Sequence, residues 1–333
     1  MQIIPTLAEL EEGVGDLLDP LAEDADSPVA RIVHRYPDRV LFLVSEVCSM
    51  YCRFCTRRRH VLDRSETKLK TEHDKAIDYI SKHPEVRDVI LSGGDALMLS
   101  VELLEGIIKK LRALPHVEII RVASRTPCVF PMRVTNEYLE MLKKYQPIYF
   151  MTHFEHPYEV TESAKAACAR IADAGFPIQN QSVLLRGVNS DPRIMKKLSH
   201  ELLKIRVKPY YIYQCDLAEG IEHFRTPVSK AFEIMEYMRG HTSGIALPTF
   251  VIDAPGGGGK IPVMPNYLLT LTNECAVMRN YRGMMSAYLN PRERDCTCST
   301  ADAIAKELTP ETPKNSGYLD LVNGKRVKLE PNV

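Results

Sequence analysis

Three cysteines, Cys48, Cys52 and Cys55, stand four and three residues apart directly after an apolar run at 40–44, Val-Leu-Phe-Leu-Val. A loop that leaves a buried strand can turn three thiolates towards one point, and thiolates suit a soft metal centre. A 4Fe-4S cluster normally takes four cysteine ligands, so three leave one iron with an open site for chemistry. A zinc site wants four ligands, which no nearby His or Cys completes, and unrelated thiols are the other alternative. The spacing therefore favours a reactive iron–sulfur cluster.

The stretch around these cysteines also resembles that of a known enzyme family. A CxxxCxxC motif in the loop after a first barrel strand is the signature of the radical S-adenosylmethionine (SAM) enzymes. The longer string CSMYCRFCTRRR resembles the lysine 2,3-aminomutase family within that superfamily. The resemblance runs from about Arg35 to Arg282. It implies a 4Fe-4S cluster on the three cysteines, SAM at the free iron, and pyridoxal 5′-phosphate (PLP) as a further cofactor.

Composition limits the partners and the location that we expect. Lys+Arg and Asp+Glu both number 43, so the formal net charge is zero, which argues against a general nucleic-acid or membrane-surface binder. No apolar run could cross a bilayer, and the N-terminal MQIIPTLAELEEG lacks the basic and apolar regions of a signal peptide. Nine cysteines, an odd number, fit a reducing compartment better than a disulfide framework. We therefore expect a cytoplasmic protein that binds neither nucleic acid nor membranes.

Strand-like and helix-like patterns alternate along the middle of the chain. The predicted strands cover 40–44, 86–91, 117–122, 147–151, 177–184 and 207–213. The predicted helices cover 71–83, 101–113, 135–145, 159–174, 191–205 and 228–239. Alternation at this spacing indicates an α/β fold with a parallel sheet. The resemblance implies the open six-unit (β/α)6 partial TIM barrel of radical SAM type, with N- and C-terminal extensions.

The two ends of the chain differ from this alternating core. Residues 1–30 carry eight acidic residues and no Lys or Arg. A segment of this kind either wraps the body of the protein or forms a frayed acidic arm. We interpret 1–34 as an N-terminal capping segment, 35–245 as the radical SAM core, and 246–333 as the lysine loop with a C-terminal extension.

Polar residues collect at the carboxyl ends of the predicted strands, where parallel α/β folds place their sites. The glycines of Ser92-Gly93-Gly94-Asp95 allow a ligand to approach the backbone, although a tight turn is the ordinary explanation of a lone glycine pair. The resemblance implies that this string holds the methionyl amino group of SAM and that Gln181 contacts SAM. It also places Phe54 near the adenine, although relatives often have His at that position.

A glycine-rich loop with one lysine, Asp253-Ala254-Pro255-Gly256-Gly257-Gly258-Gly259-Lys260, is the other conspicuous stretch. It is not a P-loop, because that pattern needs Gly at position 254 and Ser or Thr at position 261. A flexible loop and a lysine carried into a cofactor pocket remain, and a lysine amine can form a Schiff base with PLP. The resemblance makes Lys260 the catalytic PLP lysine and places Arg35 and Arg39 on the PLP phosphate, although the two arginines alone would indicate a solvated basic pair.

Charge indicates the class of substrate. An amino acid with a basic tail offers a carboxylate, an α-amine and a distal cation. The resemblance matches Arg57 to the residue that binds the carboxylate, and Asp216 and Asp253 to the pair that binds the distal ammonium, although either Asp alone would indicate a turn or a cap. The glutamate-specific relatives lack this acidic pair, so we expect a carboxylate tail to be repelled.

The resemblance implies an isomerase, a lysine 2,3-aminomutase that moves the amino group of L-lysine from C2 to C3 and gives β-lysine. An external reductant such as flavodoxin or ferredoxin would serve the cluster. The alternatives are an aminomutase that acts on arginine and one that makes β-lysine for the modification of elongation factor P. The alternative of another class is an iron–sulfur electron-transfer or regulatory protein, which would need no lysine on a glycine loop.

The C-terminal cysteines raise the question of a structural zinc site. Members of the family can bind a structural zinc through C-terminal cysteines and one cysteine of a neighbouring subunit. Here only Cys296 and Cys298 remain, no third cysteine stands at 299–301, and Asp191 sits about where the partner cysteine would. The sequence therefore argues against a zinc site and a zinc-linked tetramer, and we expect a homodimer.

Overall fold

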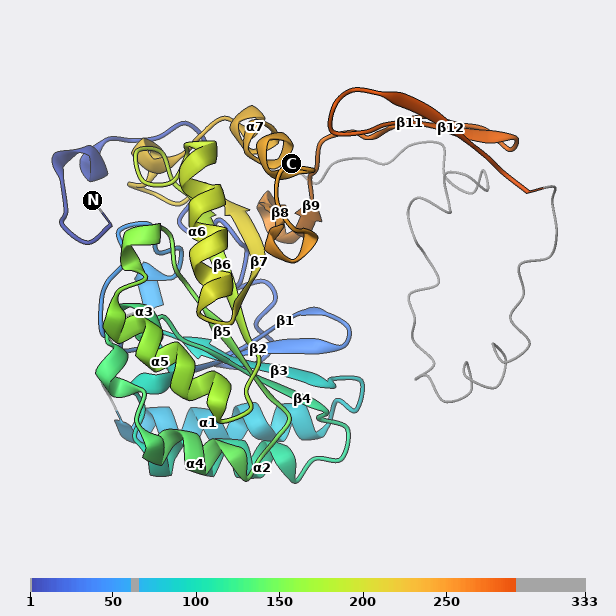
Figure 1. Ribbon diagram of the computed structural model, residues 1–333. Helices are drawn as coiled ribbons and strands as arrows, with labels where there is room; N and C mark the ends of the chain where they lie inside the picture. The colour runs from blue at the N-terminus through green and yellow to red at the C-terminus, as the bar shows by residue number, and fades with distance from the viewer. Residues whose placement is uncertain (1, 61–65, 292–333) are drawn as a thin grey trace. The chain divides into compact units, whose positions relative to one another are not determined.

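The computed structural model describes residues 2–60 and 66–291 (Figure 1). The chain forms two units, Met1–Pro265 and Asn266–Val333. The functional boundaries predicted after residues 34 and 245 stay a prediction. Cys296 and Cys298 lie outside the described residues, so the zinc prediction also stays open.

A sheet of nine strands in sequence order forms the centre of the first unit. Strands β2 to β8 pair in parallel, each with the next along the chain, and β1 and β9 pair antiparallel at the two edges. The strands are β1 (Ile32–Tyr36), β2 (Arg39–Ser45), β3 (Asp88–Gly93), β4 (Ile119–Ala123), β5 (Ile148–Thr152), β6 (Ile178–Leu184), β7 (Val207–Gln214), β8 (Thr249–Ala254) and β9 (Gly259–Pro262).

Helices connect successive parallel strands and lie along the outside of the sheet (Figure 1). Side chains of the preceding loops cap several of them, as when Ser100 Oγ accepts a hydrogen bond from the Leu103 amide at the start of α2. The helices are α1 (Glu66–Ser81), α2 (Val101–Arg112), α3 (Thr126–Val129), α4 (Asn136–Lys143), α5 (Glu162–Asp173), α6 (Pro192–Lys204) and α7 (Val228–Met238).

The predicted alternation is confirmed, with one addition. All six predicted strands are present, and each predicted helix overlaps the helix that follows its strand. The strand β8 continues the parallel order as a seventh member, which the sequence analysis assigned to the lysine-loop extension. The run is only six residues long, and no helix follows it before the glycine loop, so it carried no sign of a further repeating unit.

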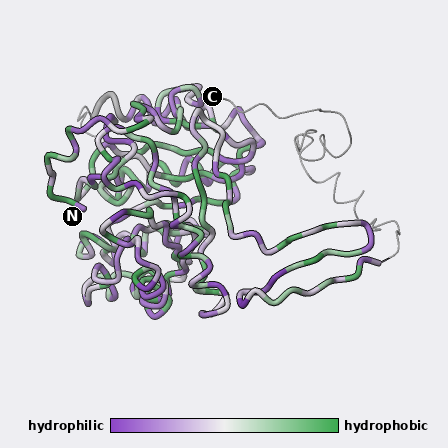
Figure 2. The backbone as a smooth tube through the Cα atoms, turned by 90° about the horizontal axis from the view of Figure 1, so that it is seen from above, coloured by the Kyte–Doolittle hydropathy of each residue, from purple (hydrophilic) through white to green (hydrophobic). Residues whose placement is uncertain are grey.

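Side chains alternate between the two faces of each parallel strand. On β4, Ile120 and Val122 belong to the main hydrophobic core, whereas Arg121 faces the inside of the barrel. On β7, Ile212 is buried in the core. Its two neighbours, Tyr211 and Tyr213, line the inside of the barrel as Arg121 does. The helices therefore cover an aliphatic face of the sheet, and the interior keeps polar and aromatic groups. Figure 2 shows the resulting mixture of hydrophobic and hydrophilic stretches along the chain.

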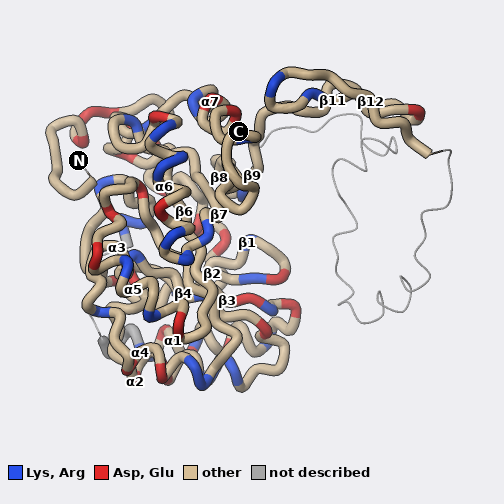
Figure 3. Tube along the Cα trace, in the orientation of Figure 1, with Lys and Arg blue, Asp and Glu red and all other residues tan. Residues whose placement is uncertain are grey.

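The second unit contains a small antiparallel sheet within its described part. Its strands are β10 (Leu268–Leu271), β11 (Cys275–Arg279) and β12 (Met285–Leu289). Over both units, acidic and basic residues are interspersed along the described chain (Figure 3). Among the described residues, no helix has the length and apolar character needed to cross a membrane.

The end of β3 lies directly against the start of the cysteine loop. The Gly94 amide donates to the Ser45 carbonyl at 2.6 Å, and the Asp95 amide donates to the Val47 carbonyl at 2.9 Å. Gly93 has a φ of +108°, and a Cβ at this residue would stand 2.2 Å from the Ser45 carbonyl oxygen. Only glycine allows this approach, so the glycine pair fixes where the cysteine loop begins.

We therefore expect Gly93→Ala to destabilise the protein by at least about 2 kcal/mol, because it combines a strained φ with a backbone clash. The matched control is Gly106→Ala in α2, where no atom stands within 4 Å of the new Cβ. That change should stabilise by about 0.5–1 kcal/mol, since alanine favours a helix over glycine. Denaturant unfolding of both variants measures the difference, and equal effects would contradict the close approach.

Candidate active site

Every residue that the sequence predicts for the cluster, SAM, PLP or the substrate lies in the wall of one cavity of about 750 Å³ in the first unit. The cavity follows the inner face of the sheet and the loops at the carboxyl ends of its strands. The predicted residues in its wall are Arg35, Arg39, Cys48, Cys52, Phe54, Cys55, Arg57, Ser92, Gly93, Gly94, Asp95, Gln181, Asp216, Asp253 and Lys260.

The three motif cysteines share one end of this cavity. The Cys55 amide donates to the Cys52 carbonyl at 3.1 Å, which turns the loop. Burial, the nearby Asp95 and the other two thiols raise the pKa of Cys48 to about 12. Among the described residues, no three His, Cys, Asp or Glu side chains stand around one point closely enough to hold a metal. The fit to an iron–sulfur cluster therefore rests on the donor set, three soft ligands on one loop.

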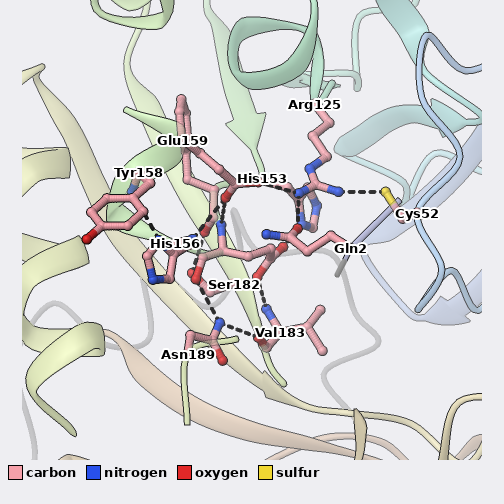
Figure 4. Close-up of polar contacts among 12 residues, drawn as sticks. Gln2, Cys52, Arg125, His153, His156, Tyr158, Glu159, Ser182, Val183 and Asn189 are labelled. Atoms are coloured by element: carbon pink, nitrogen blue, oxygen red, sulfur yellow. Dashed lines mark hydrogen bonds and ion pairs between the residues drawn. The ribbon is translucent and has the colours of Figure 1, made fainter. Parts of the chain in front are cut away.

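Arg125 is a residue of this end that the sequence analysis did not predict. Its Nη1 donates to Cys52 Sγ at 2.7 Å, and its Nη2 donates to Glu159 Oε1 at 2.8 Å and to the side chain of Gln2 (Figure 4). The guanidinium also lies 5.4 Å from the centre of the Phe54 ring. Its place directly after β4 was the only available signal. A cation now stands against one of the thiols that would carry the cluster.

The residues predicted for SAM fall into two groups. The Asp95 carboxylate is buried and accepts hydrogen bonds from the Leu97 amide at 3.0 Å and the Arg125 amide at 2.8 Å. Asp95 thus fastens the loops after β3 and β4 together, and burial raises its pKa. Gln181 on β6 instead presents its side chain to the cavity, and Phe54 packs edge-to-face on Phe224. Both residues line the cavity, but Phe54 is only 8% exposed because Phe224 and Arg125 pack against its ring.

Lys260 lies on β9, at the end of a hairpin that the glycine loop closes. Asp253 on β8 stands opposite it, and Lys260 Nζ is 3.0 Å from Asp253 Oδ1. The amine also lies 5.3 Å from the centre of the Tyr213 ring. Its own amide donates to the Tyr36 hydroxyl of β1 at 2.8 Å, so the two edge strands meet here. A lysine amine held in an aromatic-lined cavity fits the binding of PLP.

The two arginines predicted for the PLP phosphate differ in how they are engaged. Arg35 Nε donates to Asp26 at 2.6 Å, and its Nη2 donates to the Leu21 carbonyl. Arg39 lies over the Tyr36 ring at 4.0 Å and remains 38% exposed at its side chain. The guanidinium of Arg39 therefore has more free donors to offer an anion.

The three residues predicted for the substrate all line the cavity, and the charge of Arg57 acts on both aspartates. Arg57 is held by Glu23, whose carboxylate accepts from Nε at 3.0 Å and from Nη2 at 2.6 Å. Asp216 makes no hydrogen bond or ion pair within the described residues. Burial and the charge of Asp253 raise the pKa of Asp216 to about 7. Lys260 and Arg57 act on Asp216 in the opposite direction and lower its pKa, but neither forms an ion pair with it. A carboxylate with no ion-pair partner beside a second carboxylate is suited to receive a cation.

Comparisons with known proteins agree with this geometry. The model of the radical SAM superfamily matches residues 42–198, and the model named lysine-2,3-aminomutase matches residues 235–333. The L-lysine 2,3-aminomutase of Clostridium subterminale is 54% identical over 99% of this chain and 78% of its own. That of Bacillus subtilis is 52% identical over 94% of this chain and 66% of its own.

More distant matches follow. The glutamate 2,3-aminomutase of Clostridioides difficile is 47% identical over 84% of this chain and 66% of its own. A radical SAM methyltransferase structure from Sphaerobacter thermophilus aligns with a TM-score of 0.49 at 16% identity, over 66% of this chain and 68% of its own, which is too distant to add to the assignment. With its near full-length match at 54% identity, the chain belongs to the lysine 2,3-aminomutase family, isomerases of the radical SAM superfamily that work with a 4Fe-4S cluster, SAM and PLP.

Proposed function

We propose that the protein moves the amino group of L-lysine from C2 to C3 and releases β-lysine. The observation that carries the proposal is the distribution of charge in the cavity wall. Arg57 offers a guanidinium for a carboxylate, and Asp216 and Asp253 offer two carboxylates for a distal ammonium. Lys260 stands beside the acidic pair, where the amine that it presents can bind PLP.

In this proposal the chain positions the substrate and excludes water, and the bound cofactors supply the radical and the electron sink. Cys48, Cys52 and Cys55 would hold the cluster, and Gln181 and Phe54 would contact SAM beside it. Arg57 would fix the carboxylate of lysine, and the acidic pair its tail, so that the β-carbon stands at one place. Positioning matters because a displacement of about 1 Å can cost roughly a hundredfold in such a step.

The acidic pair also supports lysine over glutamate, the substrate named for the relative from Clostridioides difficile. Two carboxylates would repel the carboxylate tail of glutamate, and they would attract an ammonium or a guanidinium. The deciding experiment incubates the cluster-loaded, PLP-loaded enzyme with SAM, a reductant and one of lysine, arginine or glutamate. We expect β-lysine from lysine, and a β-amino product from arginine or glutamate alone would overturn the proposal.

The wider setting of the enzyme is also a proposal. A cluster that must be reduced needs an external electron donor, and a flavodoxin or ferredoxin has the required chemistry. An odd number of cysteines supports a reducing compartment such as the cytoplasm. We keep the homodimer as a prediction, which sizing chromatography would test. The supply of β-lysine for elongation factor P stays an alternative, which product tracing would test.

Lys260→Ala tests the cofactor site. Removing the amine should abolish both the absorbance of enzyme-bound PLP and the activity, because Lys260 is the one lysine among the described residues that lines the cavity wall. Absorption spectra of the purified variant after loading with PLP measure this. Lys208→Ala is a matched control, since Lys208 lies on β7 outside the cavity wall and should leave both readings unchanged. A PLP spectrum retained in the Lys260 variant would contradict the assignment.

Asp216 makes lysine binding depend on pH. Its folded pKa of about 7 lies above the ordinary 3.8, so below pH 7 the carboxyl carries a proton and attracts no cation. Lysine affinity should therefore rise from pH 6 to pH 7.5 and then level off. The same shift means that the folded state binds this proton more tightly. This carboxyl's contribution to stability is therefore greatest at low pH and falls as the pH rises from 4 to 7.

Asp216→Asn should raise the KM for lysine by roughly a hundredfold, about 3 kcal/mol, and flatten this pH profile. Norleucine serves as the matched ligand, because it keeps the carboxylate and the α-amine of lysine but has a neutral tail. Its binding should be insensitive to the substitution. An unchanged KM for lysine, or an equal loss for both ligands, would show that Asp216 does not bind the tail.

A further inference from the structure

The acidic N-terminal segment contributes to the cavity wall. Residues 19–27, here called the acidic turn, place Leu21 and Glu23 in the wall beside Arg57. The side chain of Glu23 is 7% exposed, and its carboxylate grips one edge of the Arg57 guanidinium through Nε and Nη2. A buried carboxylate on the guanidinium that is proposed to bind the substrate needs an explanation.

The acidic turn is fastened at several points. Arg59 pairs with Asp19 at 2.8 Å and with Asp24 at 2.6 Å, and Arg35 pairs with Asp26 at 2.6 Å. Within the turn, the hydroxyl of Ser27 donates to the Glu23 carbonyl at 2.6 Å. Displacing Glu23 from the cavity would therefore break ion pairs on both sides of it. Its position is fixed by the fold and does not depend on Arg57 alone.

The grip of Glu23 leaves the other edge of the guanidinium available. Arginine carries five N–H donors, which form two edges that can each take a carboxylate. Glu23 uses the edge formed by Nε and Nη2, and the Nη1 of Arg57 makes no hydrogen bond within the described residues. A second carboxylate, that of the substrate, can bind there while Glu23 stays in place.

Without Glu23, the Arg57 side chain would be attracted to the carboxylates of Asp216 and Asp253. The negative charge of Asp253 is near enough to raise the pKa of Arg57. The positive charge of Arg57 is near enough to lower the pKa of Asp216. A long, flexible cation in a cavity with two carboxylates would move towards them, because opposite charges attract strongly where water is excluded. It would then neutralise the pair that is proposed to bind the ammonium of lysine.

We propose that Glu23 is a positioning residue, which holds Arg57 at the carboxylate end of the site and keeps it from pairing with Asp216 and Asp253. This inference rests on the proposed function, because it assumes that Arg57 binds the substrate carboxylate. The acidic turn is then part of the substrate site. Glu23 serves there as the fixed counter-charge that keeps the positive and negative ends of the cavity apart.

The test compares two ligands that share both amines and differ in the carboxylate, L-lysine and 1,5-diaminopentane. Isothermal titration of the PLP-loaded enzyme gives both dissociation constants without any turnover. Glu23→Gln keeps the shape of the side chain and removes its charge. We expect it to weaken lysine binding by about ten- to a hundredfold and the binding of the diamine by less than about threefold. Glu23→Asp, which retains the charge, should bind lysine better than Glu23→Gln.

The matched control is Asp16→Asn. Asp16 belongs to the same acidic segment and forms an ion pair with Arg225 at 3.0 Å, with a side chain 11% exposed, but neither residue lines the cavity. This variant should bind both ligands as the unchanged enzyme does. A loss of lysine affinity equal to that of Glu23→Gln would reduce the role of Glu23 to holding the segment down, and would overturn the proposal.

The remaining outcomes separate this inference from the function on which it rests. Unchanged or tighter lysine binding in Glu23→Gln overturns the positioning role, and tighter binding would identify Glu23 as a competitor of the substrate carboxylate. An equal loss for lysine and the diamine overturns it too. If the unchanged enzyme and Arg57→Lys both fail to distinguish lysine from the diamine, the carboxylate role of Arg57 itself is wrong.

Discussion

Charges inside a barrel need counter-charges, and here an acidic segment that precedes the first strand supplies many of them. Glu9 pairs with Arg53, Glu23 with Arg57, and Asp26 with Arg35. Arg53 and Arg57 lie in the cysteine loop and Arg35 lies on β1, and an unpaired guanidinium at such part-buried positions would be costly. The positions of these three arginines therefore depend on a segment of the chain that precedes the sheet.

The cavity wall holds two chemically different sets of residues. At one end, three thiols stand with the Arg125 guanidinium on Cys52, and the glycine pair after β3 fixes the start of their loop. Elsewhere in the wall, Lys260 lies on β9, Asp253 on β8 and Asp216 in the loop after β7. The parallel sheet brings these sets together because every loop at the carboxyl ends of its strands opens on the same side. Chemistry that needs two cofactors at once can therefore take place in one chain.

Short sequence patterns were sufficient to predict the fold class and most residues of the cavity wall that were proposed to bind ligands. The cysteine spacing, the alternation of strands and helices, and the glycine loop before Lys260 are each written in a few consecutive residues. The contacts of Arg125 and Glu23 are not, because their partners stand 73 and 34 residues away along the chain. In the sequence alone, Arg125 is one of several polar residues that follow the predicted strands, and Glu23 is one of eight acidic residues in 1–30. The sequence also did not reveal that the Gly93–Asp95 backbone fixes the start of the cysteine loop, because the resemblance assigned these residues to SAM binding.

The open seam of the sheet has a consequence for how the enzyme is loaded. The strand order runs from β1 to β9 without pairing those two strands to each other, and the edges meet where the Lys260 amide donates to the Tyr36 hydroxyl. Releasing one such bond costs about 1 kcal/mol, far less than unzipping a strand ladder. A barrel closed by a continuous ladder would have to exchange a large cofactor through its mouth. In this one, β9 carries Lys260, the lysine proposed to bind PLP, and the bond from its amide to Tyr36 lies outside the strand ladder. Breaking that bond would leave the ladder and the hydrophobic core intact.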